Sequence, residues 1–439
     1  MPQSLVAGAA SVEINPTESL FLFGYPHVKR YSTGIHDALL SSALYLSDGQ
    51  NPAIFVANDV IAVSKDSTRR VRQRISQETG VPAENIMLTA THTHSAPSTA
   101  DWLSNESDPI VPKANKKFIQ QFEDAMVKSA VGAYRSAQPA ELGLVIADGT
   151  GCGTNRHNPA GQSDQQVPVL VARSLKDNKA IAAMLVYAMH PTVLHENSTL
   201  VSGDFPAMSR KYIQHHVLGT QCVVLHHSGV AGNQSPRHVT NGNTFAEAER
   251  LGQLLGKAVR KAVAELSYVS EANIRCRSAG VDLPMRTFPD PAQAKAEVDR
   301  THQRLEKLRK ENAPRTDVRT AECDTFGAEE TLTLSKAAKE GRLAKAVEMA
   351  LPAEVQVIEI GQWTFVAWPG ETFVEFGLQV RKKHPNVFVI TLANGETQGY
   401  LVTQEAIDNN WYEATNAVFQ SPQGPQALVD QTLKMLTDR

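Results

Sequence analysis

Short apolar segments alternate along the chain with longer segments that carry apolar residues on one helical face. The short segments are rich in valine and isoleucine and have the length of buried strands. They cover residues 10–14, 53–57, 86–89, 142–147, 168–172, 182–188, 222–225, 355–360, 364–367 and 387–391. Amphipathic helices with a 3.6-residue spacing are predicted over residues 67–79, 114–137, 244–266 and 372–383. This alternation predicts an α/β fold, with mixed β-sheets covered by helices.

Residues 289–352 differ in composition from the rest of the chain, because they are rich in Lys, Arg, Glu and Ala with leucines at intervals. We interpret them as a charged helical insertion that packs on the main body, with its charges on a solvated face. The expected organisation is one domain over residues 1–420 that contains this insertion, followed by a C-terminal helix over residues 421–439.

Composition and charge narrow the classes of partner. The chain has 439 residues, of which 42% are hydrophobic, so it can bury a large core. Its net charge is −3 and no basic run with interleaved aromatic residues is present, so no nucleic-acid partner is expected. The longest apolar stretches, such as residues 181–189, have the length of strands, so no transmembrane segment is expected.

The N-terminus and the cysteines bear on the compartment and on metal ligands. The first residues lack the basic region and apolar core of a secretory signal, which favours a cytoplasmic protein, or a secreted or periplasmic one if a signal has been removed. The four cysteines form no CxxC pair and are expected to be free thiols. Any metal must therefore be held by histidines and carboxylates.

A pair of histidines follows the apolar strand 86–89. His92 and His94 stand two positions apart in the segment THTHSAP. On extended backbone such side chains point to the same side, so one imidazole can bind a metal while the other acts beside it as an acid or base. The alternative is a pair of histidines at an ordinary polar turn.

Two further candidates also stand at the ends of predicted strands. His190 follows the strand 182–188, and Glu371 follows the strand 364–367 after a Pro-Gly turn. Strand ends are where α/β enzymes place functional groups. Two imidazoles and one carboxylate form the ligand set of many catalytic zinc sites.

Each of these assignments has a competitor. A glutamate in a first helical turn, such as Glu371, often only compensates the helix dipole. His226 and His227 lie at yet another strand end and compete as ligands. The segment GVAGNQSPR has neither the GxSxG nor the P-loop spacing. Its Ser235 is a weak alternative as a nucleophile, because no base and no orienting acid can be assigned to it from the sequence.

Polar groups in three loops can assist a metal site. Tyr400 in GYLVT and Tyr412 in NNWYEATN stand beside loops, and a phenol near a metal can ligate it or donate a hydrogen bond to an oxyanion. Arg156 in GTNRHNP carries a guanidinium fork that suits a carbonyl or carboxylate. The structural alternatives are half-buried tyrosines and an arginine in a surface ion pair.

The motifs together resemble the neutral/alkaline non-lysosomal ceramidase family, zinc-dependent amide hydrolases that split N-acylsphingosine into sphingosine and a fatty acid. The resemblance runs from residue 6 to residue 417, and the order and spacing of the motifs agree. They are AGAASVEINP, LFGY, GIHDAL, THTHSAP, TNRHNP, MHPT with SGD, AGNQSP, PGET, GYLVT and WYEATN.

The resemblance implies roles for seven residues. The zinc ligands of the family fall on His92, His190, Glu371 and Tyr400. The catalytic histidine falls on His94, and the substrate-orienting groups fall on Arg156 and Tyr412. Under this hypothesis zinc lowers the pKa of a water towards ~7, His94 carries its proton to the leaving amine, and Tyr412 and Arg156 stabilise the tetrahedral oxyanion.

This sequence departs from the family pattern at several places. These differences leave the identity of the substrate open, whereas the predicted metal chemistry is unaffected. No secretory signal and no C-terminal immunoglobulin-like domain are recognised, so the ceramidase-like zinc hydrolase domain over residues 1–420 is expected to stand alone. Asn233 occupies a position where the family has Asp, and residues 99–113 lack the Gly-rich character of the family loop. The expected partner is a small-molecule or lipid-like amide, and no oligomeric state is predicted.

Two alternatives to a ceramidase-like amidase therefore stay open. The first is a hydrolase of another amide, ester or lactone with a small polar substrate. The second is a metal-stabilised binding protein without turnover, which the presence of His94, Arg156 and Tyr412 disfavours because structure alone does not require them.

Overall fold

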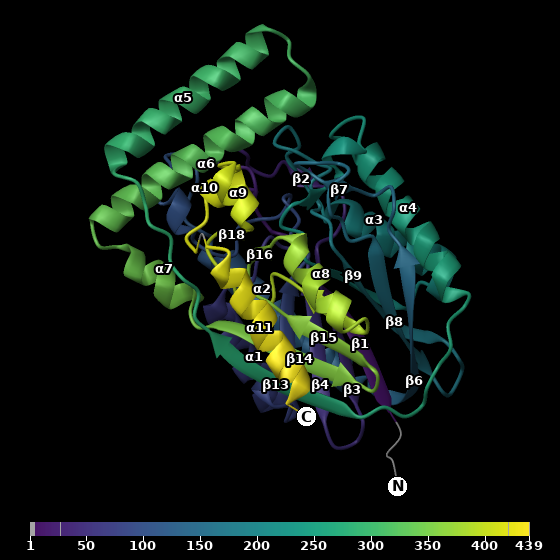
Figure 1. The fold of residues 1–439 in the computed structure, drawn as a ribbon. Coiled ribbons are helices and arrows are strands. Elements are labelled where there is room, and N and C mark those ends of the chain that lie inside the picture. Colours follow the sequence, from purple (N-terminus) through teal and green to yellow (C-terminus); the bar gives the residue numbers. More distant parts are fainter. Residues whose placement is uncertain (1–4, 27, 420, 439) are drawn as a thin grey trace.

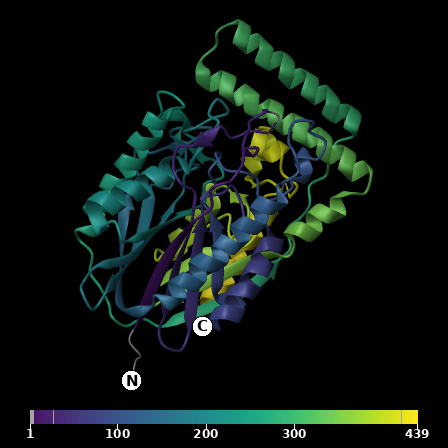
Figure 2. The same cartoon turned by 180° about the vertical axis from the view of Figure 1, so that it is seen from behind.

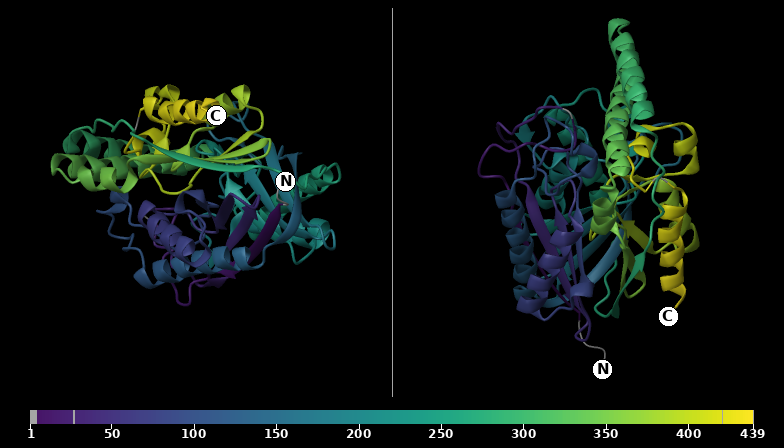
Figure 3. Two further views of the ribbon diagram at one scale, coloured as in Figure 1. Left: turned by 90° about the horizontal axis from the view of Figure 1, so that it is seen from below. Right: turned by 90° about the vertical axis from the view of Figure 1, so that its left-hand side faces the viewer.

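The computed structural model describes residues 5–26, 28–419 and 421–438. Two β-sheets pack against each other through one shared apolar core, and helices cover their outer faces (Figure 3). Both termini lie at one end of the molecule, and a pair of long helices projects from the other end (Figure 1). These layers confirm the predicted α/β fold with mixed β-sheets covered by helices.

The larger sheet has eight strands in two halves, which are joined only where Val6 and Ala7 of β1 meet Pro139 and Gln138 of β6. The first half contains β1 (Val6–Glu13), β3 (Leu40–Ser47), β4 (Pro52–Asn58) and β5 (Ile86–Ala90). The second half contains β6 (Gln138–Asp148), β8 (Gln166–Ser174), β9 (Ala180–Tyr187) and β11 (Val223–Ser228). The pairs β4–β5 and β9–β11 are parallel, and the other pairs are antiparallel.

The smaller sheet has four strands and shares the core with the larger one. Its strands are β13 (Ile274–Val281), β14 (Ala353–Ile360), β15 (Trp363–Ala367) and β17 (Val387–Ile390). Phe365 of this sheet packs edge to face on Phe55 of β4, with ring centroids 5.6 Å apart. Three two-stranded ladders lie near the site: β2 (Gly34–Ile35) with β10 (Leu200–Val201), β7 (Thr154–Asn155) with β12 (Gln234–Ser235), and β16 (Glu371–Thr372) with β18 (Tyr400–Leu401).

Helices cover both sheets. Contacts join α1 and α2 to each other and α2 to the first half of the large sheet, α3 and α4 to its second half, and α8 and α11 to the small sheet. Their bounds are α1 (Lys65–Thr79), α2 (Lys116–Arg135), α3 (Asp204–Ile213), α4 (Phe245–Val263), α8 (Val374–Lys383) and α11 (Gln423–Thr437). Short helical turns are η1 (Ala83–Asn85), η2 (Leu103–Asn105), η3 (Gln214–Leu218), η4 (Pro236–His238), α9 (Gln404–Asp408) and α10 (Tyr412–Thr415). Side chains of Ser64, Asn115 and Thr244 cap α1, α2 and α4 by accepting backbone N–H groups.

The predicted charged insertion is a helical hairpin with a third helix: α5 (Pro291–Lys310), α6 (Arg315–Lys339) and α7 (Leu343–Ala350). Asp290 begins α5 with a capping box. The α5–α6 pair projects beyond the sheets in the rear view as well (Figure 2). Ion pairs such as Arg304 with Asp324 and Arg309 with Glu322 join the two helices. The inner side of α6 lines the cavity described below.

Some elements lie outside the sequence prediction. Strands β3 and β13 and helix α3 were not predicted, and β3 (LSSALYLS) shows why: it is buried along most of its length although half its residues are serines and alanine. All four cysteines are free, as expected. Within the described ranges no helix is long and apolar enough to cross a membrane. The division at residue 420 stays a prediction, and residues 1–4, 420 and 439 lie outside the described residues.

Candidate active site

His92 and His94 follow β5, but not on extended backbone. The strand ends at Ala90, and His92 has a φ of 71°, in the left-handed region that non-glycine residues rarely adopt. Its backbone is held there because the Thr91 and His92 N–H groups donate to Asn58 and Val60. We expected the two side chains to lie on the same side because of strand alternation. They do lie close together, but strand alternation is not the cause. The backbone turn at Thr91 and His92, after the end of β5, brings the two side chains together.

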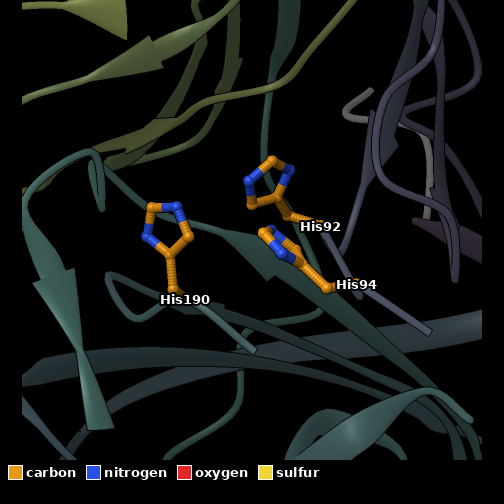
Figure 4. A group of neighbouring side chains, drawn as sticks. All are labelled: His92, His94 and His190. Atoms are coloured by element: carbon orange, nitrogen blue, oxygen red, sulfur yellow. The ribbon is translucent and has the colours of Figure 1, made fainter. Parts of the chain in front are cut away.

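Three groups from three separate strand ends converge on one point. The Nε2 atoms of His92 and His190 lie 3.1 and 3.0 Å from the same oxygen, Oε2 of Glu371. The rings of His92 and His190 are 4.9 Å apart, and that of His94 is 4.9 Å from His92. Figure 4 shows the three imidazoles gathered at this place. The structure thus brings together the residues that the sequence placed at the ends of β5, β9 and β15.

The hydrogen bonds behind these imidazoles fit a bound cation. Nδ1 of His92 lies 2.7 Å from the Ile61 carbonyl, and Nδ1 of His190 lies 2.8 Å from the Ala231 carbonyl. A carbonyl can only accept, so each Nδ1 carries the proton and each Nε2 presents a lone pair. Two lone pairs and a carboxylate oxygen that face one another repel unless a proton or a cation lies between them. Histidines that ligate a metal are usually oriented in this way, because the ring nitrogen that does not bind the metal donates its proton to a carbonyl.

Electrostatics agree with this arrangement. Burial lowers the pKa of His190 to about 4, so its imidazole is neutral at pH 7. Burial alone would raise the pKa of the Glu371 carboxyl, but His92 and His190 beside it lower that pKa well below its ordinary value. Nitrogen atoms of His92, His94 and His190 that could ligate a metal all lie within 4.8 Å of one another.

His94 stands beside the three converging groups, and neither of its ring nitrogens has a hydrogen-bond partner among the described residues. Burial and then the neighbouring His92 and His190 lower its pKa well below the ordinary value. Tyr25 packs edge to face on its ring at 5.1 Å, and the Tyr25 hydroxyl donates to the Leu194 carbonyl. Gly24 lies against the same ring: a Cβ at this glycine would meet Cγ of His94 at 2.5 Å.

Under the hypothesis from the sequence that His94 is an acid–base group beside a metal, Gly24→Ala should displace His94 and lower turnover while leaving the metal bound. A shift of about 1 Å in a catalytic group can reduce kcat about 100-fold. Gly24 also has a φ of 118°, so alanine adds backbone strain. Gly80→Ala is the matched control, since Gly80 has a φ of 74° with nothing within 4 Å of the added Cβ. Equal kcat values and metal contents for both variants would show that contact with His94 is unimportant.

Glu371 and Tyr400 are neighbours because of the β16–β18 ladder. This pair of short strands is parallel, and its register sets Glu371 opposite Tyr400. Glu371 is therefore not in the first turn of the following helix: α8 begins at Val374, and Glu375 is the acidic residue of its first turn. The alternative of a dipole-compensating role for Glu371 was wrong. Burial, followed by the Glu371 charge, raises the pKa of the Tyr400 phenol well above its ordinary value.

Arg156 and Tyr412 complete the group of predicted site residues. The hydroxyls of Tyr400 and Tyr412 lie 2.9 Å apart, and the Arg156 guanidinium lies over both rings, 5.2 and 4.9 Å from their centroids. Arg156 Nε donates to Glu413 at 2.6 Å and Nη2 donates to the Gly232 carbonyl at 2.6 Å. It is a buried, ion-paired arginine, so the alternative of a surface ion pair was wrong.

Glu413→Gln should lower the free energy of unfolding by about 3 kcal/mol at pH 7, because it leaves Arg156 buried without its carboxylate. Burial alone would raise the pKa of Glu413, but the charges of Arg156 and His157 outweigh this effect and lower that pKa to about 2. A lowered pKa stabilises the fold above the unfolded value of 4.5, and this contribution is lost as the pH falls toward 2. Urea midpoints should show a gap between wild type and variant that narrows below pH 4.5.

The control for that measurement is Glu405→Gln, which removes an exposed carboxylate on α9. Its midpoint should follow that of the wild type at every pH. A Glu413→Gln protein as stable as the control at pH 7 would contradict the proposed dependence on the buried pair.

The competing groups have other partners, although Ser235 also lines the cavity described below. His227 Nδ1 is 2.7 Å from the Thr89 hydroxyl, and His226 packs edge to face on Phe205, so neither belongs to the histidine cluster. Ser235 lies in β12, and its hydroxyl accepts the Arg237 N–H as a helix cap. Asn233 donates to the Glu375 carboxylate at 3.0 and 3.1 Å, which explains an amide rather than a carboxylate at this position.

A cavity of about 650 Å³ opens above the converging groups. Six of the seven predicted residues line it, and the seventh, His190, contacts Glu371. Sequence reasoning missed much of the remaining wall. His195 and His238, which have no assigned role in the sequence, and Tyr25 and Trp102 line the cavity, as does the inner side of α6. The sequence signals for this wall were the LFGY motif, which contains Tyr25, and the loop of residues 99–113, which contains Trp102.

Comparison with known proteins identifies the family. The sequence model of the family described as "Neutral/alkaline non-lysosomal ceramidase, N-terminal" matches residues 7–238. Neutral ceramidase B and neutral ceramidase A of Dictyostelium discoideum are each 24% identical to this chain, over 212 and 200 residues. These alignments cover 44% and 42% of this chain and 28% of each relative, so they span less than a third of the relatives' length.

Solved structures share the fold over nearly the whole chain. The crystal structure of neutral ceramidase from Pseudomonas aeruginosa aligns with a TM-score of 0.74 at 18% identity, covering 99% of this chain and 75% of that one. A structure described as a ceramidase complexed with C2 aligns with the same score and coverage at 17% identity. The family match spans His92, His94, Arg156 and His190, and more than half of the sequence. The chain therefore belongs to the neutral/alkaline non-lysosomal ceramidase family.

Proposed function

We propose that this protein is a zinc-dependent hydrolase that cleaves the amide bond of an N-acyl compound with water. One observation carries the proposal: Nε2 of His92 and Nε2 of His190 converge on Oε2 of Glu371, while both Nδ1 atoms donate to carbonyls. Neutral imidazoles oriented in this way, with one carboxylate, are the ligands of catalytic zinc sites.

In this proposal His92, His190 and Glu371 hold the metal, and Tyr400, opposite Glu371 in the β16–β18 register, supplies a fourth ligand. When bound, the metal supplies a Lewis acid that polarises the substrate carbonyl and lowers the pKa of water. His92 and His190 keep their orientation because their Nδ1 protons are committed to carbonyls.

The proton transfers fall to His94. Its two ring nitrogens have no partner among the described residues, so one of them can take a proton from the attacking water. The same proton then goes to the nitrogen of the leaving amine as the carbon–nitrogen bond breaks, so water and amide become a carboxylic acid and an amine. Tyr412, held by its contact with Tyr400 and by Arg156 over its ring, donates to the tetrahedral oxyanion.

The family and the cavity support two candidate substrate classes. The relatives are named as ceramidases, and ceramide is an N-acyl amide, which makes N-acylsphingosine the first substrate to test. A hydrolase of a more polar amide is the second candidate. It is favoured by the charged side chains that α6 contributes to the cavity wall, among them Arg319, Glu322 and Glu330.

The test is metal-dependent release of amine. Protein treated with a chelator should lose hydrolysis of N-acyl amides and regain it with zinc, and a range from N-acylsphingosine to short N-acyl arylamides should find the preferred class. Hydrolysis unaffected by complete removal of metal would refute zinc dependence. No hydrolysis of any N-acyl compound by zinc-loaded protein would refute the amidase.

A further inference from the structure

One wall of the cavity above the histidine cluster is cationic. Arg315 and Arg319 come from α6, and Arg237 comes from the turn after β12; all three line the cavity. We call these three residues the arginine cluster. Apolar and aromatic side chains, including Phe23, Trp102 and Phe326, line the same cavity. The cavity therefore joins an apolar surface to a group of guanidinium ions.

Arg319 is the only member of the arginine cluster with carboxylate partners among the described residues. Arg319 pairs with Glu196 at 3.2 Å and with Glu322 at 2.9 Å. Arg315 donates to the Asn243 side-chain oxygen at 2.5 Å, and Arg237 has long contacts only, 3.5 Å to the Thr320 hydroxyl and 3.7 Å to the Cys323 sulfur. Neither Arg237 nor Arg315 has a carboxylate partner among the described residues. Two positive charges at this wall are left for a ligand.

All three guanidinium groups of the arginine cluster act electrostatically on the same imidazole, that of His195. His195 lines the cavity beside them, and its pKa is lowered well below the ordinary value, first by burial and then by Arg319, Arg315 and Arg237. Tyr25 connects this end of the cavity to the catalytic end. Its ring lies 5.5 Å from the ring of His195, 5.3 Å from the Arg319 guanidinium and 5.1 Å from the ring of His94. One aromatic ring thus separates the arginine cluster from the proposed acid–base group.

We propose that the arginine cluster binds a carboxylate of the substrate, so that the enzyme prefers N-acyl amides with an anionic group remote from the scissile bond over neutral amides of the same size. This inference rests on the proposed amidase function, whose substrate class it narrows. A guanidinium fork binds a carboxylate through two parallel hydrogen bonds. Glu196 and Glu322 lie in the same wall and disfavour a second negative charge, so a singly charged carboxylate suits the cluster better than a phosphate.

The experiment compares matched substrates. One pair places the charge on the acyl half: the N-glutaryl and N-pentanoyl amides of one chromogenic arylamine. The second pair places it on the amine half: an N-acyl-6-aminohexanoate and its primary amide. We expect kcat/KM to favour the anionic member of one pair by roughly 10-fold or more, the size of one charge-assisted hydrogen bond. The pair that shows the preference identifies the half that faces the arginine cluster.

Two variants test whether the cluster causes the preference. Arg237→Gln and Arg315→Gln should each reduce it several-fold without changing kcat/KM for the neutral member, because neither side chain supports a carboxylate of the protein. Arg300→Gln is the control, since Arg300 lies exposed on α5 and pairs with Glu297. A preference that is absent in the wild type, or that survives both cluster variants, overturns the proposal.

A binding measurement separates this proposal from the amidase itself. Calorimetry with both substrate pairs should show tighter binding of the anionic member in one pair, and this difference should be reduced in Arg237→Gln. If this holds and no compound of either pair is hydrolysed, the amidase fails while the carboxylate site stands. If the anionic and neutral members of both pairs are hydrolysed at equal rates and bind equally, the amidase stands and the carboxylate site is refuted.

Discussion

His190→Ala should release the metal and abolish hydrolysis. Nε2 of His190 lies 3.0 Å from Oε2 of Glu371, and its Nδ1 donates to the Ala231 carbonyl. Alanine removes one proposed ligand and leaves the Glu371 carboxylate facing His92 alone. Loss of one of few protein ligands weakens metal affinity by far more than loss of a supporting hydrogen bond, which alone costs 10- to 100-fold. Elemental analysis of purified variant and wild type measures the loss directly.

His302→Ala is the control for this variant. His302 lies exposed on α5, contacts Glu329 at 2.8 Å and is not among the described residues that line the cavity. Metal content and hydrolysis should match the wild type. A His190→Ala protein that retains stoichiometric metal would show that the converging groups are not the metal site.

His94→Ala should retain the metal and lose most turnover. His94 lies beside the converging groups rather than on the Glu371 oxygen, and its nitrogens have no partner among the described residues. Loss of a general acid–base group typically lowers kcat about 10²- to 10⁴-fold. The variant leaves a space next to Tyr25, so added imidazole should restore part of kcat.

The metal content of His94→Ala decides between two roles. His94 is close enough to His92 and His190 for all three to offer nitrogen atoms to one ion. If His94→Ala loses the metal as completely as His190→Ala, then His94 is a ligand, and the proton transfers belong to another group. If it keeps the metal but imidazole restores nothing, the acid–base role loses its support.

Much of the fold follows from local pattern. Strand β9, AIAAMLVY, is a continuous apolar run, and helices such as α4 show their buried face in the spacing of leucines. Strand β3 could not be predicted from the local pattern, because its small polar residues are not hydrophobic. They are buried because α2 and neighbouring strands pack against them. The hydroxyls of Ser41 and Ser129 lie 3.1 Å apart, so the burial of these serines depends on tertiary packing, which the local sequence does not reveal.

His92, His190 and Glu371 could be proposed as candidates because each follows a predicted strand, whereas the geometry that brings them together could not be predicted. The roles of Arg156, Tyr400 and Tyr412 came from the family resemblance and stay predictions. The φ of His92 depends on hydrogen bonds to the segment after β4, and the nearness of Glu371 to Tyr400 depends on a two-residue ladder. The inner wall formed by α6 was missed for a related reason. Arg319 lies in a charged sequence typical of a solvated helix, and only packing reveals which side of that helix faces the cavity.

The measurement that tests the account most directly is zinc content and amide hydrolysis on one preparation, purified without added metal and assayed before and after chelation. The account predicts about one zinc per chain, hydrolysis of an N-acyl amide that falls with the zinc, and recovery of both on reconstitution. Hydrolysis that persists without metal, or a chain that binds no metal when zinc is supplied, would contradict it.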